Sequence, residues 1–408
     1  MYNLCGEKMD NSASVKITKK IKQDNTLSKA IVFPIIILSI QNVMLFILSD
    51  YSINVAEIFK FFLRLIVGFI YAIIFIKYFR YLFKKFLAVY LIAILILSLQ
   101  FLFFFNEYTI SLVIILLLVN LPIFIFSYSI YNPKEFYNVL VKASKIIFII
   151  NFLGALLLFS RSNSDYNMTL SYYILIPAIV EINEFLNKKK LFSLLIFALS
   201  SIIIISFGSR GALLCLIIYV FLRFYIYTKN KNLKIVFLKL FLALLIIFGI
   251  LNINGIIVFL NNMLISIGIN SRTLYLFLNN FDHLSGRNEI YELILGYISK
   301  QSLFGSGIGY DRVLLNGAYS HNLFLEMIIN FGLIVGVLMF VILFTMTIFA
   351  SVRDIANKDN LITILIILGL VYLTFSGSYL TDITFWIFLG FTISNIFRKN
   401  RRKYETNY

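Results

Sequence analysis

The feature that most constrains this chain is a series of apolar runs long enough to cross a lipid bilayer. A transmembrane α-helix needs about 20 mainly apolar residues. The composition agrees, because 61% of the residues are hydrophobic and only 13% are charged, whereas soluble chains carry about 25% charged residues. We find about 12 such runs, at 30–49, 61–79, 86–105, 109–130, 146–160, 171–186, 191–207, 211–228, 235–251, 322–350, 361–378 and 381–397. The sequence therefore predicts an all-α, polytopic integral membrane protein with about 12 transmembrane helices.

One long polar segment, 252–321, interrupts this series and divides the chain into five parts. We predict a basic tail at 1–29, helices at 30–251, a loop at 252–321, helices at 322–397 and a second basic tail at 398–408. Within the loop, apolar residues recur with the spacing of an amphipathic helix from Asn288 onward, and the shorter apolar stretch 255–269 suits an interfacial helix. We therefore expect the loop to lie against the bundle at headgroup depth.

The positive charge of the chain is arranged as a topology signal. The formal net charge is +17, which by itself would suit nucleic acid. However, with a cytoplasmic N-terminus, only eight of the 36 Lys and Arg residues fall at outer positions: Lys60, Arg64, Arg161, Arg210, Arg272, Arg287, Lys300 and Arg312. The remaining basic residues follow the positive-inside rule. We therefore expect both termini in the cytoplasm, the loop outside, contact with membrane lipid, and no nucleic-acid partner.

Two arginines of the outer side are candidates for binding an anion. Arg210 lies in a Ser-Phe-Gly-Ser-Arg-Gly connection between two predicted helices, and Arg287 begins the amphipathic helix of the loop. A guanidinium binds phosphate bidentately and stays charged, and the N-terminus of a helix favours an anion. The alternative for Arg210 is an arginine that anchors a helix end at the headgroups, and for Arg287 a solvated loop position.

His321 is the strongest candidate for acid–base chemistry. It lies where the outer loop enters the tenth predicted helix, and an imidazole with a pKa of about 6.5 suits a general base near neutral pH. Ser320 is a candidate cap for that helix, and Glu326 is a candidate to orient the imidazole, although five residues is a poor spacing for direct contact. The alternative is a histidine with only a capping role.

Several further residues have open roles. Arg64 either joins the anion site or anchors a helix end, Glu181 is an intramembrane carboxylate or a partner of Lys188 to Lys190, and Asp382 is expected at a helix N-terminus. Gly305 to Gly309 resembles half of a dinucleotide fingerprint, but no strand precedes it, so we expect a flexible turn. His283 and Asp282 are too few ligands for zinc or manganese, so we expect no metal and no cofactor.

The order of these elements resembles the O-antigen ligase and polymerase superfamily, which includes Wzy-type repeat-unit polymerases. The resemblance rests on Ser209-Arg210-Gly211, Gly286-Arg287, the glycine turn and His321-Asn322-Leu323-Phe324-Leu325-Glu326. It implies a metal-independent membrane glycosyltransferase of the GT-C type. Arg210 and Arg287 would hold the diphosphate of an undecaprenyl-diphosphate glycan and His321 would activate the acceptor hydroxyl.

The resemblance also implies the wider setting. The partners would be an undecaprenyl-diphosphate-linked oligosaccharide donor and acceptor at the bacterial cytoplasmic membrane, with a chain-length regulator and a flippase as further partners. Asn322, Glu326 and Arg64 are expected to contribute to substrate binding. We expect a polymerase of surface-polysaccharide repeat units, because the Ile-, Lys-, Asn- and Phe-rich composition suggests an AT-rich source in which a lipid A acceptor is less expected.

Three alternatives remain open at this stage. A ligase of this superfamily would transfer a finished glycan to a different acceptor, and the motifs do not distinguish it from a polymerase. A flippase for the same lipid-linked oligosaccharide would need polar residues along several helices and related halves, and neither is evident here. A scaffold for a synthesis complex would remain active without His321.

Overall fold

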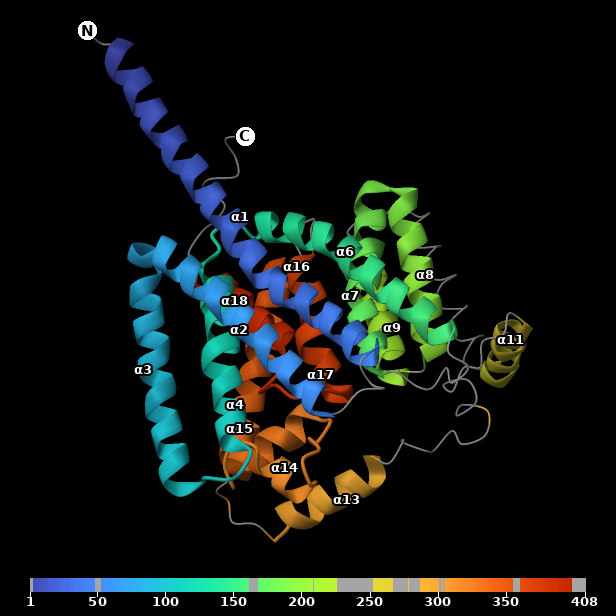
Figure 1. Ribbon diagram of the computed structural model, residues 1–408. Coiled ribbons are helices and arrows are strands. Elements are labelled where there is room, and N and C mark those ends of the chain that lie inside the picture. Colours follow the sequence, from blue (N-terminus) through green and yellow to red (C-terminus); the bar gives the residue numbers. More distant parts are fainter. Residues whose placement is uncertain are drawn as a thin grey trace.

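The computed structural model is a bundle of α-helices (Figure 1), and it describes residues 3–47, 53–160, 168–207, 209–225, 252–266, 278, 287–300, 303, 305–354 and 360–397. No strand occurs within these ranges, so the predicted all-α class is confirmed. The first part of the bundle comprises α1 (Asn3–Ile47), α2 (Ile53–Lys77), α3 (Phe79–Phe103), α4 (Thr109–Ile115), η2 (Leu116–Asn120), α5 (Leu121–Ser129), α6 (Pro133–Ser160), α7 (Met168–Lys188), α8 (Leu191–Phe207) and α9 (Arg210–Tyr225).

The second part carries the short helices of the predicted loop and the C-terminal helices. These are α11 (Ile253–Ser266), α13 (Arg287–Ile298), α14 (Tyr310–Leu314), α15 (Leu323–Asp354), α16 (Leu361–Ile366), η3 (Ile367–Val371), α17 (Tyr372–Phe375) and α18 (Ile383–Phe397). In Figure 1, α13 and α14 lie at one end of the bundle, and the N-terminal end of α1 projects from the other. We call the first of these the α13 end.

Seven helices of the described residues are long and apolar enough to cross a membrane. They are Thr18–Leu45, Ile58–Lys77, Phe79–Phe103, Thr109–Ser129, Pro133–Leu158, Met168–Lys188 and Leu323–Asp354. Three shorter apolar helices coincide with other predicted spans: Leu191–Phe207, Leu361–Phe375 and Ile383–Phe397. The predicted count of about 12 is therefore not confirmed, and the predicted span at 235–251 lies outside the described residues.

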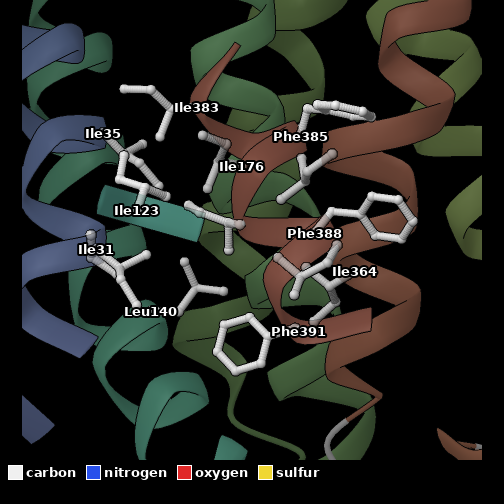
Figure 2. Packing of buried hydrophobic residues seen from close by; sticks show 14 of the residues in the cluster. Ile31, Ile35, Ile123, Leu140, Ile176, Ile364, Ile383, Phe385, Phe388 and Phe391 are labelled. Carbon is white, nitrogen blue, oxygen red and sulfur yellow. The ribbon is translucent and has the colours of Figure 1, made fainter. Parts of the chain in front are cut away.

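The core is built from aliphatic and aromatic side chains of helices that are distant in sequence. Figure 2 shows Ile31 of α1, Leu140 of α6, Ile176 of α7 and Phe388 of α18 converging between the helices. By contrast, many large apolar side chains of α2 and α3 are exposed, and Leu102 is 75% exposed. An apolar surface of this extent suits contact with lipid hydrocarbon instead of water.

Helix α15 is kinked at Gly332, where φ is 85° and ψ is 168°. Such a kink removes intrahelical hydrogen bonds and leaves backbone carbonyls that need other donors. The glycine turn supplies them, because Ser306 N donates to Ile329 O at 2.9 Å and Gly307 N donates to Asn330 O at 3.0 Å. A Cβ at Gly305 would lie 2.3 Å from Asn330 O. The turn therefore fastens the segment before α14 to α15, and only glycine permits this close approach.

Candidate active site

His321 lies in the short connection between α14 and α15, in an unusual backbone conformation. Its φ is 54°, a left-handed region that side chains other than glycine rarely adopt. Asn322 follows it and caps α15, because its Oδ1 accepts from Phe324 N at 3.0 Å and from Leu325 N at 3.2 Å. The prediction that Ser320 caps this helix is therefore wrong, since Asn322 directly precedes the first turn and Ser320 Oγ donates to Asn322 O instead.

The imidazole of His321 is kept neutral and retains hydrogen-bonding capacity. Its ring centroid lies 4.1 Å from that of Tyr319, and within the described residues Nδ1 has no hydrogen-bond partner. Burial, together with the positive charge of Arg287, lowers the pKa of His321 to about 4. At neutral pH this histidine can therefore accept a proton, in a setting where water is partly excluded.

Arg287 is the first residue of α13, and apolar packing holds that helix in place. Ile294 of α13 is fully buried against Leu325 and Ile329 of α15. The Arg287 guanidinium acts electrostatically on His321, Tyr319 and Tyr172. Among the described residues, no carboxylate forms a salt bridge with it. Its charge and the N-terminus of α13 together make a positive region beside the imidazole.

Arg210 begins α9, and its neighbours explain the Ser-Arg-Gly sequence. Ser209 caps α9 by accepting from Ala212 N at 3.3 Å. A Cβ at Gly211 would lie 2.1 Å from the hydroxyl of Tyr172 on α7 and 3.0 Å from Phe375 Cβ on α17. Glycine therefore lets α9 start directly against Tyr172, which Arg287 also influences. The start of α9 is therefore next to a tyrosine that also lies in the electrostatic field of Arg287, the other predicted anion-binding arginine.

A buried ionic network lies next to the chain segment that carries His321. Arg312 Nη1 lies 2.9 Å from Asp311 Oδ1 and 3.5 Å from Glu326 Oε1, and Arg312 Nη2 donates to Ser378 Oγ at 2.9 Å. Glu326 Oε1 also accepts from Ser378 Oγ, and Oε2 accepts from Tyr379 N at 3.3 Å. The Glu326 carboxylate thus binds Arg312, Ser378 and Tyr379. The prediction that Glu326 orients the His321 imidazole is therefore wrong, because the carboxylate points to these other groups.

This network is connected to the backbone of the histidine segment. Asp311 Oδ2 accepts from Ser320 N at 3.1 Å, directly before His321. Burial raises the pKa of Asp311, while Arg312 and the Ser320 N–H favour the charged form. Arg312 supplies one positive charge to two buried carboxyl groups that would otherwise have no cation beside them. The network therefore fixes the segment from which His321 projects.

A cavity of about 180 Å³ lies beside this segment. Its lining includes Tyr172 and Tyr173 of α7, Tyr319, and Tyr372 of α17, together with Asp382 and Thr384. Tyr319 lines the cavity, and its ring also contacts the imidazole of His321 in a tilted arrangement. The site therefore combines a neutral histidine, a positive helix start and a tyrosine-rich cavity.

The remaining predicted residues take other positions. Arg64 is exposed on α2, a helix that packs mainly against α1, α3 and η2, so its role in the anion site stays a prediction. Glu181 is fully buried and accepts from Ser144 Oγ at 2.7 Å, whereas Lys188 pairs with Glu184 at 2.9 Å. Asp382 Oδ1 accepts from Phe385 N at 3.0 Å at the start of α18, which is the predicted position at a helix N-terminus.

Metal binding is not indicated by the part of the chain that the structure describes. Within it, no group of three or more His, Cys, Asp and Glu residues is suitably clustered. His283, Asp282, Arg272 and Gly208 lie outside the described residues.

Sequence reasoning missed the buried network and the cavity. Arg312 stands out only as a further arginine of the loop, and Ser378 has no local signal that links it to a residue 66 positions away. The four tyrosines that line the cavity occur in apolar or loop segments, where aromatic residues are common and do not indicate a site. A usable signal was the Asp311-Arg312 pair, because adjacent opposite charges in an apolar surrounding suggest a buried ion pair.

Comparison with known proteins agrees with this arrangement. Residues 195–341 match the family model described as O-antigen ligase, and this range contains Arg210, Arg287, the glycine turn, His321 and Glu326. No curated protein matches the chain. The resemblance predicted from the motifs is therefore confirmed over residues 195–341, which are similar to the O-antigen ligase family.

Proposed function

We propose that the protein joins undecaprenyl-diphosphate-linked oligosaccharide repeat units into a surface polysaccharide. The reaction would take place on the outer face of a bacterial cytoplasmic membrane, with the α13 end outside and both termini inside. Support for the reaction class comes from the family domain at 195–341. Support for the sidedness comes from the positive-inside charge pattern and from the position of α13 and α14 opposite the start of α1 (Figure 1).

The observation that carries the proposal is the pairing of a neutral His321 with the positive charge of Arg287. The imidazole has a free Nδ1 within the described residues and a pKa of about 4. A glycosyl transfer from a lipid diphosphate needs a base for the acceptor and positive charge for the leaving group. These two requirements are met by neighbouring groups at one end of the bundle.

The reaction can be written with these groups. His321 takes the proton of an acceptor hydroxyl, and the hydroxyl oxygen forms a bond to the anomeric carbon of the donor glycan. The bond between that carbon and the diphosphate oxygen breaks, and undecaprenyl diphosphate leaves with the electron pair. Arg287 and Arg210 stabilise its charge, and loss of one such donor costs about 10²–10³ in rate.

Donor binding would also strengthen the base. Arg287 is one cause of the low pKa of His321. A diphosphate bound at Arg287 would offset that positive charge and raise the pKa of His321, while burial, the larger cause of the low pKa, would still act. The histidine would then be a stronger base when the donor is in place.

The test uses membranes supplied with lipid-diphosphate repeat units, and it separates the products on a gel by chain length. We expect a ladder from the wild type and none from His321→Ala. Arg287→Lys, which keeps the charge but loses bidentate binding, is expected to reduce the ladder strongly. Arg223→Lys is the matched control, because Arg223 is an arginine near the opposite end of α9 and binds Asn183 and Asn187. A full ladder from His321→Ala would refute the assigned base.

A second candidate is transfer of a glycan to a different acceptor. The description of the matching family as O-antigen ligase favours it. In the same assay, a ligase would attach a glycan once to the foreign acceptor and would give no ladder from repeat units alone. A chain-length regulator and a flippase are proposed partners of the polymerase.

A further inference from the structure

The tyrosine-rich cavity has a built-in hydrogen-bond acceptor. Asp382 lines it, and the described contacts of its side chain use Oδ1, which accepts from Phe385 N at 3.0 Å and from Thr384 Oγ1. Neither of these two hydrogen bonds uses Oδ2. The carboxylate also acts electrostatically on Tyr173 and Tyr372. One oxygen thus caps α18 and the other is available to a ligand.

We propose that this cavity holds the terminal sugar ring of the acceptor glycan, with Asp382 accepting hydrogen bonds from its hydroxyl groups. The inference rests on the proposed function and assigns the acceptor, not the donor, to this space. Tyrosine rings offer apolar faces for the C–H side of a sugar and hydroxyl groups for its polar edge. A carboxylate accepts such hydroxyl hydrogen bonds strongly.

Charge separates the two substrates. A diphosphate would be repelled by the Asp382 carboxylate, whereas Arg287 and the start of α13 favour it. Tyr319 joins the imidazole to the cavity, because its ring centroid lies 4.1 Å from that of His321 and it also lines the cavity. An acceptor hydroxyl near Tyr319 would therefore lie close to the imidazole, and Arg287, which acts electrostatically on His321 and Tyr319, would hold the donor nearby.

The size of the cavity agrees with one ring. Its volume is about 180 Å³, below the about 300–1,000 Å³ of sites that take drug-sized ligands. A whole oligosaccharide repeat unit would not fit, so the rest of the acceptor would extend away from the protein. The cavity would thus recognise only the non-reducing terminal sugar of the acceptor.

The test uses a repeat-unit oligosaccharide without lipid or diphosphate, labelled and blocked at its reducing end, which can accept but cannot donate. Purified full-length protein transfers glycan from the lipid-diphosphate repeat unit to this probe, and the KM of each substrate is measured separately. We expect Asp382→Asn to raise the acceptor KM about 10- to 100-fold, as loss of a charged hydrogen bond would, and to leave the donor KM unchanged. The amide oxygen of Asn can still cap α18.

Asp354→Asn is the matched control, since Asp354 accepts from Ile362 N at 3.0 Å as a buried carboxylate at the other end of α15. An unchanged acceptor KM in Asp382→Asn, or a rise in the donor KM instead, would overturn the inference while leaving the proposed function intact. Absence of transfer by the wild type would overturn the proposed function itself. If Asp382→Asn is not recovered folded, Tyr173→Phe is measured with the same two outcomes.

Discussion

At the scale of single residues, the protonation of His321 controls the chemistry that we propose. Its pKa of about 4 lies below the ordinary value of 6.5 because the ring is buried beside Arg287. The free protein therefore keeps this histidine neutral down to pH values well below 6.5. We expect bound diphosphate to offset the charge of Arg287 and so to make the histidine easier to protonate in the complex.

The prediction concerns the acid limb of the pH profile. The pH dependence of kcat/KM reports the pKa of the base in the free protein, and the pH dependence of kcat reports its pKa in the substrate complex. As the pH is lowered, we therefore expect kcat to fall at a higher pH than kcat/KM. Initial rates between pH 4 and 8 measure both limbs. Coincident limbs would show that donor binding does not change the base.

The same residue links pH to stability. A histidine whose folded pKa is depressed binds fewer protons than the unfolded chain between its folded and unfolded values. Its contribution to the free energy of unfolding is therefore fully present above pH 6.5 and is lost as the pH falls toward about 4. We expect His321→Gln to lose less thermal stability than the wild type as the pH falls from 6.5 to about 4. An identical pH dependence in wild type and variant would contradict the burial of the neutral ring.

At the scale of elements, the start of α9 depends on its contact with α7. An alanine at Gly211 would place its Cβ 2.1 Å from the Tyr172 hydroxyl. We expect Gly211→Ala to destabilise the protein by about 1–3 kcal/mol through overpacking, and Tyr172→Phe in the same chain to restore part of it. Gly68→Ala is the control, because a Cβ there meets nothing within 4 Å. Thermal unfolding in detergent measures all three, and an unaffected Gly211→Ala would show that this contact is not close.

The contact between α14, α15 and the connection from α17 to α18 depends on Arg312. Replacing Arg312 with Met leaves Asp311 and Glu326 buried without their cation, and breaking such pairs costs about 3–5 kcal/mol. We therefore expect Arg312→Met to lower the unfolding temperature strongly, and Glu326→Gln in the same chain to recover part of the loss. Arg353→Met is the control, since Arg353 is exposed and binds the Asn395 carbonyl. Equal unfolding temperatures for Arg312→Met and the wild type would contradict the buried network.

At the scale of the whole molecule, the sequence predicts helices better than it predicts contacts between them. Apolar runs are local, so α3 and α15 could be placed from composition, and the periodicity after Asn288 predicted α13. The link between Arg312 and Ser378 joins positions 66 residues apart, and the cavity joins α7, α17 and the start of α18. Such long-range contacts depend on how the helices pack, and a local sequence pattern does not predict that packing. Arg210, Arg287 and His321 could be chosen as site candidates because polar residues are rare in so apolar a chain, and their roles stay predictions.

We propose that the α13 end of the bundle transfers glycans from a lipid diphosphate. The most direct measurement reconstitutes the purified protein into liposomes that contain lipid-diphosphate repeat units as their only glycan, and follows product length and release of undecaprenyl diphosphate together. We predict that chains lengthen with one diphosphate released per bond formed, and that His321→Gln stops both. Wild-type protein that moves lipid-linked units across the bilayer without lengthening them would contradict the account and support a transporter.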